Sequence, residues 1–188
     1  MDYGGKWRDI KQLGLQIASV IILAVVFMGC QSQEPSLSPA ATSLKQNLKK
    51  IIDNFSLALG KPIADQDKKS INLKLEELFK RANSQEVPGL LDITVLDHKA
   101  LRLASHPEGT NNVQSFSNYR TVRKALAEGK IVQARLFFQD GFRLYVICVP
   151  TLHKHEVKGL IILCFDATAV NNQSGVTEEE FLAIDFNR

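Results

Sequence analysis

The sequence predicts an α+β fold, in which a five-stranded antiparallel β-sheet carries long N-terminal helices packed on it. Two observations predict this class. Apolar residues recur at helical spacing between residues 43 and 82, whereas after Pro88 β-branched and aliphatic runs of strand length alternate with turn residues. Because the helices precede a set of hairpin-connected strands, the order favours helices on the faces of an antiparallel sheet over alternating β–α units.

The first 29 residues have the composition of an export signal. A basic stretch (residues 6–11) precedes an apolar run (residues 17–27), and the segment ends in Gly29-Cys30. It resembles a bacterial lipoprotein signal. The resemblance implies that residues 1–29 are a signal peptide, and that the Cys30 thiol receives a diacylglycerol and becomes the first residue of the mature protein.

An uncleaved membrane helix is the alternative for this segment. Residues 13–29 as a helix would extend about 25 Å, against a hydrocarbon core of about 30 Å. In both interpretations the basic N-terminal flank stays in the cytoplasm, and the chain after the apolar run is exported. Gln31 after the cysteine resembles lipoproteins sent to the outer membrane, which implies its periplasmic face if the host has two membranes.

The composition of the exported part excludes one partner class and suits a single domain. Once the signal is removed the chain is close to neutral and has no basic tract, so nucleic-acid binding is not expected. The remaining 159 residues are enough to bury a stable hydrophobic core without disulfides or a structural metal. Cys148 and Cys164 lie inside apolar runs and are expected as buried thiols. An exported location also allows a disulfide between them.

A tether and two helices are expected to come first. Residues 30–42 contain the lipidated cysteine and a Ser- and Pro-rich stretch that reads as flexible. Ser43 with Gln46 forms a capping-box pattern, and an amphipathic helix follows until Gly60-Lys61-Pro62 interrupts it. A second helix is predicted from Asp65 to about Ala82.

Five strands and two shorter helices are predicted downstream. Ser117 is expected to cap a helix that Gly129 ends, and Asp140-Gly141 predicts a hairpin turn. Thr177 with Glu180 is a capping box for a short terminal helix. The predicted strands cover residues 90–96, 100–105, 131–138, 142–152 and 157–166.

Three stretches in this order resemble the Cache domain, an extracytoplasmic PAS-like sensor module of bacteria. They are Ile93–Asp97 with Leu103–Pro107, then Phe116–Gly129, and finally Leu144–Pro150 with Gly159 and residues 160–167. The resemblance implies a PAS-like sheet, a small-molecule pocket between the sheet and the loop–helix segment, and a sensor role. Residues 73–103 also resemble a Roadblock/LC7 domain, whose mostly cytoplasmic location conflicts with the export signal.

The resemblance sets the expected domain organisation. Residues 43–168 form the Cache-like domain with its N-terminal helices, and residues 169–188 form a C-terminal tail with a short helix. No sequence resembling an output module follows the last strand. A lipid-anchored protein of this kind is expected to bind a ligand and to present it, or its own altered shape, to a partner.

Five side chains are predicted to contact the ligand. An apolar pocket needs a few inward polar groups. Arg135 can grip a carboxylate with two hydrogen bonds, and Asp166 can pair with an amine or with Arg135. Tyr145 offers a ring and a hydroxyl, and Tyr119 and Arg123 lie four residues apart on one helix. The ligand is expected to be a small carboxylate or amino acid.

Catalysis, a cofactor and a metal are not expected. The chain has no hydrolase elbow, phosphate loop or paired-cysteine motif. His153 and His155 can share one strand face, but two ligands make a weak metal site and this segment reads as a solvated turn. An enzyme using this turn remains a third hypothesis. His106 can contact a ligand from the loop over the predicted pocket, or it is an ordinary surface residue.

Two functions from different classes follow. The first is a lipid-anchored, extracytoplasmic sensor-type domain that binds a small molecule. The alternative is a structural or interaction lipoprotein with a closed pocket, which dimerises or binds a partner through residues 43–82. A pocket filled by the protein's own side chains favours the alternative.

Overall fold

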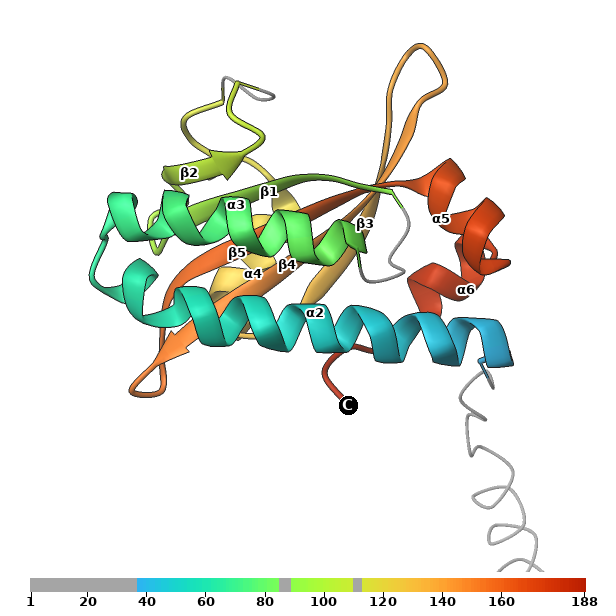
Figure 1. Ribbon diagram of the computed structural model, residues 1–188, viewed down its shortest axis with the longest axis horizontal. Helices are drawn as coiled ribbons and strands as arrows, with labels where there is room; N and C mark the ends of the chain where they lie inside the picture. Colours follow the sequence, from blue (N-terminus) through green and yellow to red (C-terminus); the bar gives the residue numbers. More distant parts are fainter. Residues whose placement is uncertain (1–36, 85–88, 110–112) are drawn as a thin grey trace, which may run out of the picture. The chain divides into compact units, whose positions relative to one another are not determined.

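The structure is a computed structural model that describes residues 37–84, 89–109 and 113–188, and Leu37–Arg188 form one compact unit. The predicted signal peptide and Cys30 lie outside the described residues. Five antiparallel strands form a single sheet of order β2-β1-β5-β4-β3 (Figure 1). The predicted α+β class is confirmed, with strands β1 (Leu90–Asp97), β2 (Arg102–His106), β3 (Val132–Phe137), β4 (Arg143–His153) and β5 (Glu156–Asp166).

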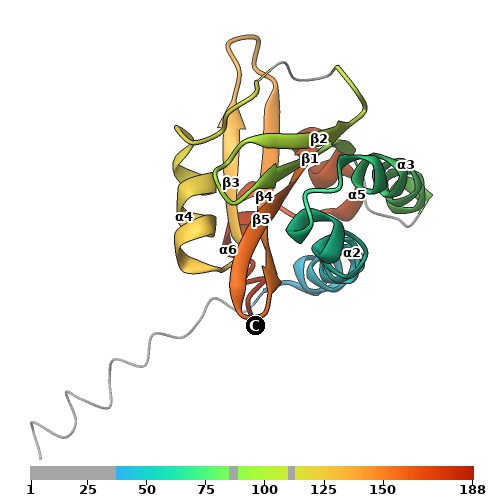
Figure 2. The same cartoon turned by 90° about the vertical axis from the view of Figure 1, so that its left-hand side faces the viewer.

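Two long helices, α2 (Pro39–Ala64) and α3 (Lys68–Ser84), cover one face of this sheet. Figure 2 shows them on one side of the strands and α4 (Arg120–Glu128) on the other. The apolar stripes predicted from the spacing are buried as expected in both long helices. They comprise Leu44, Leu48, Ile51, Ile52 and Phe55 in α2, and Ile71, Leu75, Leu78 and Ala82 in α3. Phe79, which is predicted in the same stripe of α3, is only partly buried.

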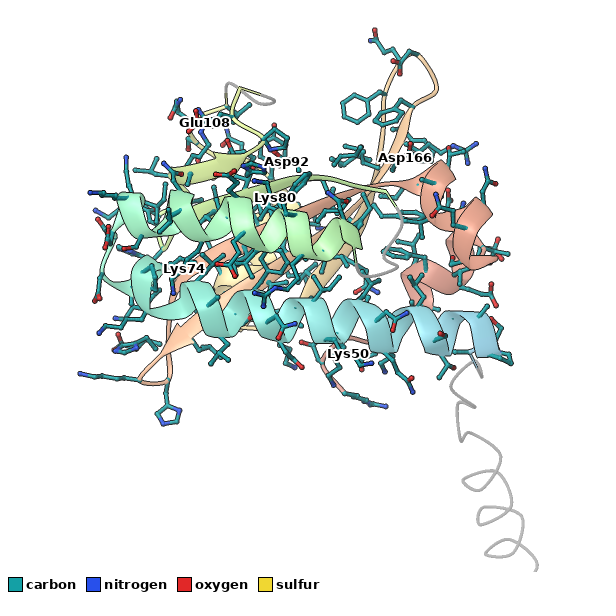
Figure 3. The ribbon with its side chains drawn as sticks, viewed as in Figure 1. Lys50, Lys74, Lys80, Asp92, Glu108 and Asp166 are labelled. Carbon is teal, nitrogen blue, oxygen red and sulfur yellow. The ribbon has the colours of Figure 1, made fainter. Side chains whose placement is uncertain are left out.

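The first helix is longer at both ends than the sequence predicts. It begins at Pro39 with Ser38 as its N-cap, so the last residues of the predicted 30–42 tether are helical. It also continues through Pro62, where the sequence predicts a break. Proline lacks the N–H that would donate to the carbonyl four residues earlier. That carbonyl, Ala58 O, instead accepts a hydrogen bond from Lys74 Nζ at 3.0 Å, which explains how α2 tolerates the proline (Figure 3).

The cap predicted for α4 is wrong. The helix starts at Arg120 with Tyr119 at its N-cap, and the Ser117 hydroxyl lies 3.1 Å from the Ser115 hydroxyl instead of capping the helix. Gly129 ends the helix in the left-handed conformation, as predicted. The helix is therefore shorter at its start than the serine pattern indicates.

Two further helices follow the last strand at one end of the sheet. Helix α5 (Ala167–Ser174) was not predicted, whereas α6 (Glu178–Ala183) begins with the predicted capping box of Thr177 and Glu180. After α6 the chain returns along β3, where Asn187 exchanges hydrogen bonds with the backbone of Ile131. The C-terminal segment thus packs on the domain rather than leaving it as a tail.

The sheet separates two hydrophobic cores, which we call the first and the second core. The first core lies between the sheet and α2, α3, α5 and α6, and includes Phe55, Tyr145 and Phe165. The second core lies under α4 and includes Val146 and Cys148. Because successive residues of a strand point to opposite faces, Tyr145 and Val146 belong to different cores.

One contact between α2 and the sheet requires a glycine and generates a stability prediction. A Cβ at Gly159 would lie 2.2 Å from the Leu96 carbonyl oxygen and 2.6 Å from Ile63 Cγ2. Gly159→Ala should therefore lower the free energy of unfolding by about 2–3 kcal/mol, as overpacked cores do. The measurement is urea unfolding followed by circular dichroism.

Gly60→Ala is the matched control. A Cβ there meets no atom within 4 Å, and the residue lies inside α2. This substitution should raise the free energy of unfolding by about 0.5–1 kcal/mol, because alanine loses less conformational freedom in a helix. Equal effects of the two substitutions would contradict this account of the helix–sheet contact.

Candidate functional site

The space predicted to hold a ligand, between the sheet and the segment that ends in α4, is occupied by the protein's own side chains. Phe116, Val122 and Ala125 pack there against the sheet, and each is at least nine-tenths buried. The strand side chains that meet them are apolar or thiol, namely Leu96, Val146, Cys148, Leu160 and Ile162. Two polar side chains continue the same face along β1, where the buried Thr94 hydroxyl donates to Asp92 Oδ1. The part of this face under α4 therefore has the chemistry of a core.

The two cysteines of the domain are free thiols, and both face the second core. Burial raises the pKa of the Cys148 thiol to about 12, although a hydrogen bond with the Thr121 side chain opposes the shift. Burial also raises the pKa of Cys164, with a smaller contribution from the Asp92 charge. Both thiols are protonated at neutral pH and lack the thiolate character of a reactive cysteine.

Two of the predicted ligand residues, Arg135 and Tyr145, hold α6 on the sheet. They are register partners on β3 and β4, and Arg135 forms an ion pair with Glu178 at the start of α6. The Tyr145 ring is fully buried and stacks on Phe181 with centroids 3.9 Å apart, and its hydroxyl lies 2.9 Å from the Asn171 side chain. Desolvation of the buried phenol raises its pKa.

The other three predicted residues lie elsewhere. Asp166 is the N-cap of α5, and its Oδ1 accepts hydrogen bonds from the N–H groups of Thr168 and Ala169 (Figure 3). Tyr119 and Arg123 are exposed at α4, on the second-core face. The predicted set is therefore divided between the two faces of the sheet and its end, and the five residues do not line one cavity.

The histidine-rich segment His153–Glu156 forms the exposed turn between β4 and β5. Lys154 and His155 both have positive φ there, of 52° and 66°, so the strand does not persist through the turn. Within the described ranges, no group of three or more His, Cys, Asp or Glu side chains can hold a metal ion.

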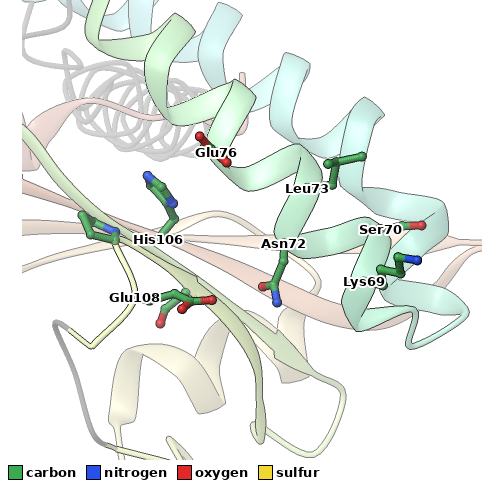
Figure 4. A pocket seen from close by; sticks show the side chains of 9 residues that line it. Lys69, Ser70, Asn72, Leu73, Glu76, His106 and Glu108 are labelled. Carbon is green, nitrogen blue, oxygen red and sulfur yellow. The ribbon is translucent and has the colours of Figure 1, made fainter.

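An open cleft of about 710 Å³ lies between α3 and the end of β2 (Figure 4). Its volume falls in the range of small-molecule sites, which is about 300–1,000 Å³. Helix α3 presents a stripe of Lys69, Asn72 and Glu76, since residues three and four apart share one face of a helix. His106, the last residue of β2, and Glu108, in the loop after it, face this stripe.

Two contacts place the polar groups of this cleft. The Lys80 ammonium, 2.6 Å from Glu76 Oε1, lowers the pKa of the Glu76 carboxyl, so the carboxylate stays charged. The His106 ring packs 4.8 Å from the Phe79 ring, which belongs to the partly buried edge of the first core. The lining therefore combines an ammonium, two carboxylates, an amide and an imidazole with the apolar side chains of Leu73 and Pro107.

A second hollow of about 330 Å³ adjoins the cleft. It shares Asn72, Ser105 and Glu108 with the larger one and extends toward Arg102. Sequence reasoning named His106 as a candidate but missed the α3 residues. The spacing of residues 69, 72 and 76 places them on one polar face of the helix, and this pattern could have indicated them from the sequence.

Comparison with solved structures shows the fold. The sensor domain of E. coli DcuS aligns with a TM-score of 0.55 and 18% identity, covering 74% of this chain and 100% of that chain. The sensor domain of the V. cholerae histidine kinase DctB aligns with a TM-score of 0.53 and 16% identity, covering 82% of this chain and 61% of that chain. The chain therefore has the PAS-like fold of sensor domains, as the sequence predicted.

Sequence comparison adds no relative. No family model matches the chain, and no curated protein resembles it significantly. Among the residues that the structure describes, none of the helices is both long and apolar enough to cross a bilayer.

The buried thiol of Cys148 predicts a pH dependence of stability. Its pKa is about 12 in the folded protein and near 9 when exposed, so the folded state holds the proton more tightly. The stabilisation is complete below about pH 9 and is lost as pH rises toward 12, at up to about 1.4 kcal/mol per pH unit.

Cys148→Ala should therefore flatten the decline of unfolding free energy between pH 9 and 10.5, whatever its effect at pH 7. Urea unfolding of the wild type and the variant at these pH values measures the two slopes. Parallel slopes would show that the thiol is not buried as the structure has it.

Proposed function

We propose that this protein is a lipid-anchored, extracytoplasmic sensor-type domain that binds a small amino acid or carboxylate in the cleft between α3 and β2. One observation carries the proposal. The cleft places charged groups of both signs around a cavity of small-molecule size, whereas the opposite face of the sheet is packed with apolar side chains. No catalytic step is part of this function.

The charges of the cleft favour a ligand that carries both a positive and a negative charge. Lys69 can bind a carboxylate, and Glu76 and Glu108 can bind an ammonium group. Asn72 offers a donor and an acceptor between them, and His106 adds an imidazole ring that can also take part in hydrogen bonds. An α-amino acid matches this set better than a simple carboxylate, which would leave two glutamates facing its negative charge.

The anchor and the location rest on the sequence. The segment ending at Gly29-Cys30 resembles a lipoprotein signal, and Gln31 fits the outer-membrane address in a two-membrane host. The PAS-like fold is compatible with a sensor role in the envelope, since the DcuS and DctB structures described above are sensor domains. The protein would then present its ligand-bound shape to a partner in the envelope.

The ligand prediction is tested by thermal unfolding of residues 31–188 against amino acids, short carboxylates, amines and purines. A ligand at 100 times its dissociation constant should add about 2.7 kcal/mol of stability, which is visible as a raised midpoint. Lys69→Ala and Glu76→Gln should each weaken binding about 10- to 100-fold, since a charge-assisted hydrogen bond contributes about 1.5–3 kcal/mol.

Two control variants locate the site. Lys50→Ala removes an exposed charge from α2, and should leave the ligand-induced shift unchanged. Arg135→Ala should loosen α6 and lower stability but keep the shift, because Arg135 pairs with Glu178 and does not line the cleft. A shift that Arg135→Ala abolishes and Lys69→Ala spares would overturn the proposed site.

A structural or interaction lipoprotein is the second candidate. The filled second core favours it, as do the side chains of Leu57 and Leu73, which are 87% and 76% exposed on the two long helices. In this case no small molecule would shift the unfolding midpoint, and residues 31–188 would dimerise in sedimentation measurements. Leu57→Ser with Leu73→Ser would then restore the monomer.

The anchor predicts a separate result in cells. Cys30→Ser should prevent attachment of the lipid, so a labelled fatty acid should appear on the wild type and not on the variant. The variant should keep its uncleaved signal and have a higher mass. A wild-type protein of full length without lipid would favour the membrane-helix interpretation of residues 13–29.

A further inference from the structure

The hairpin that joins β3 to β4 carries a concentration of exposed aromatic side chains. Phe137, Phe138 and Phe142 are 60%, 48% and 39% exposed, and Leu136 beside them is also exposed. Figures 1 and 2 show the hairpin projecting beyond the helices that cover the rest of the sheet. Isolated apolar residues are common on protein surfaces, but four within seven positions of one projecting turn form a patch.

The hairpin has two chemically different faces. The rings of Phe138 and Phe142 lie 6.0 Å apart on one face. On the other, the Arg135 guanidinium lies 4.1 Å from the centre of the Phe137 ring, and Arg143 is the register partner of Phe137. Aromatic rings beside guanidinium groups are suited to the boundary between lipid headgroups and acyl chains.

The base of the hairpin is connected through α6 to the start of α2, from which the chain continues toward Cys30. Arg135 pairs with Glu178 at the start of α6, and Glu180 in the same helix is hydrogen-bonded to the Ser38 side chain at the start of α2. Eight residue steps separate Cys30 from Ser38. Fully extended they reach roughly 26–29 Å, so a lipid on Cys30 keeps this end of the domain near the bilayer.

We propose that this hairpin is a second membrane contact, with its aromatic side chains inserted into the interface of the bilayer that holds the lipid. The inference rests on the proposed anchor at Cys30. Phe138 and Phe142 enter the headgroup region, and Arg143, about half exposed and 3.6 Å from Glu178, can reach a lipid phosphate. The contact fixes the orientation of the domain, and the cleft between α3 and β2 keeps access to solvent.

The charge balance predicts how this contact responds to salt. Arg135 and Arg143 on the hairpin are offset by Asp140 in its turn and by Glu178 of α6, so these four groups together have no net charge. Attraction to anionic lipid therefore contributes little, and burial of aromatic surface drives the contact. Binding should change little between low and high salt.

The test uses tryptophan fluorescence, because the single tryptophan, Trp7, belongs to the predicted signal. Residues 30–188 with Phe138→Trp are coupled through Cys30 to a maleimide lipid in vesicles of phosphatidylethanolamine and phosphatidylglycerol. The raised pKa values of Cys148 and Cys164 leave Cys30 as the reactive thiol at pH 7.

The Phe138→Trp emission should move to shorter wavelength on coupling, and lipids with brominated acyl chains should quench it. Leu57→Trp is the control, since Leu57 is exposed on α2 about 28 Å along the helix from Ser38. Its emission should stay unchanged. Phe137→Ser with Phe142→Ser in the Phe138→Trp chain should remove the quenching.

Unquenched Phe138→Trp emission on vesicles would overturn the proposal. The same shift in lipid-free protein at rising concentration would also overturn it, since a second copy would then cover the patch. Chemical coupling replaces the cell's own lipidation, so a negative result here is independent of the Cys30→Ser experiment. A positive result supports the hairpin contact even where the ligand screen fails.

Discussion

The burial of both faces of the neighbouring strands β4 and β5 is the constraint on which the rest of the structure depends. In β4 and β5 five consecutive residues are buried, so both faces of the sheet must be covered. Helices α2 and α3 cover one face and α4 covers the other. This requirement fills the space under α4 with apolar side chains. It leaves open, polar space beside the short edge strand β2, where α3 passes over the sheet's margin.

Much of the fold could be predicted because burial leaves a periodic pattern. The apolar stripes of α2 and α3 and the hairpin strands β3 to β5 were found from spacing and turn residues alone. The predicted helix ends are wrong where a side-chain contact in the folded protein outweighs the local sequence signal. Pro62 does not end α2 because Lys74, from the next helix, satisfies the freed Ala58 carbonyl. Ser117 has the chemistry of a cap, but its hydroxyl pairs with Ser115 instead.

The site was harder to predict, since exposed polar residues leave no period that distinguishes a ligand contact from a solvated surface. The sequence predicts Arg135 and Tyr145 as ligand contacts because of their side-chain chemistry. In the structure these two side chains hold α6 on the sheet, through Glu178 and Phe181. The cleft residues come from α3 and from the end of β2 with the loop after it, some thirty positions apart in sequence. The packing of His106 on Phe79, together with Ala104 of β2 in the first core, brings these segments together.

The central claim, that the ligand binds between α3 and β2, is tested most directly by amide chemical shifts of isotope-labelled residues 31–188. The protein would be titrated with the amino acid that raises its unfolding midpoint most. The account predicts that shifted amides cluster in residues 69–76 and 105–108, with little change in α4. Shifts that cluster instead in residues 116–126 and in the facing parts of β4 and β5 would show that the second core opens for the ligand. That result would contradict the account.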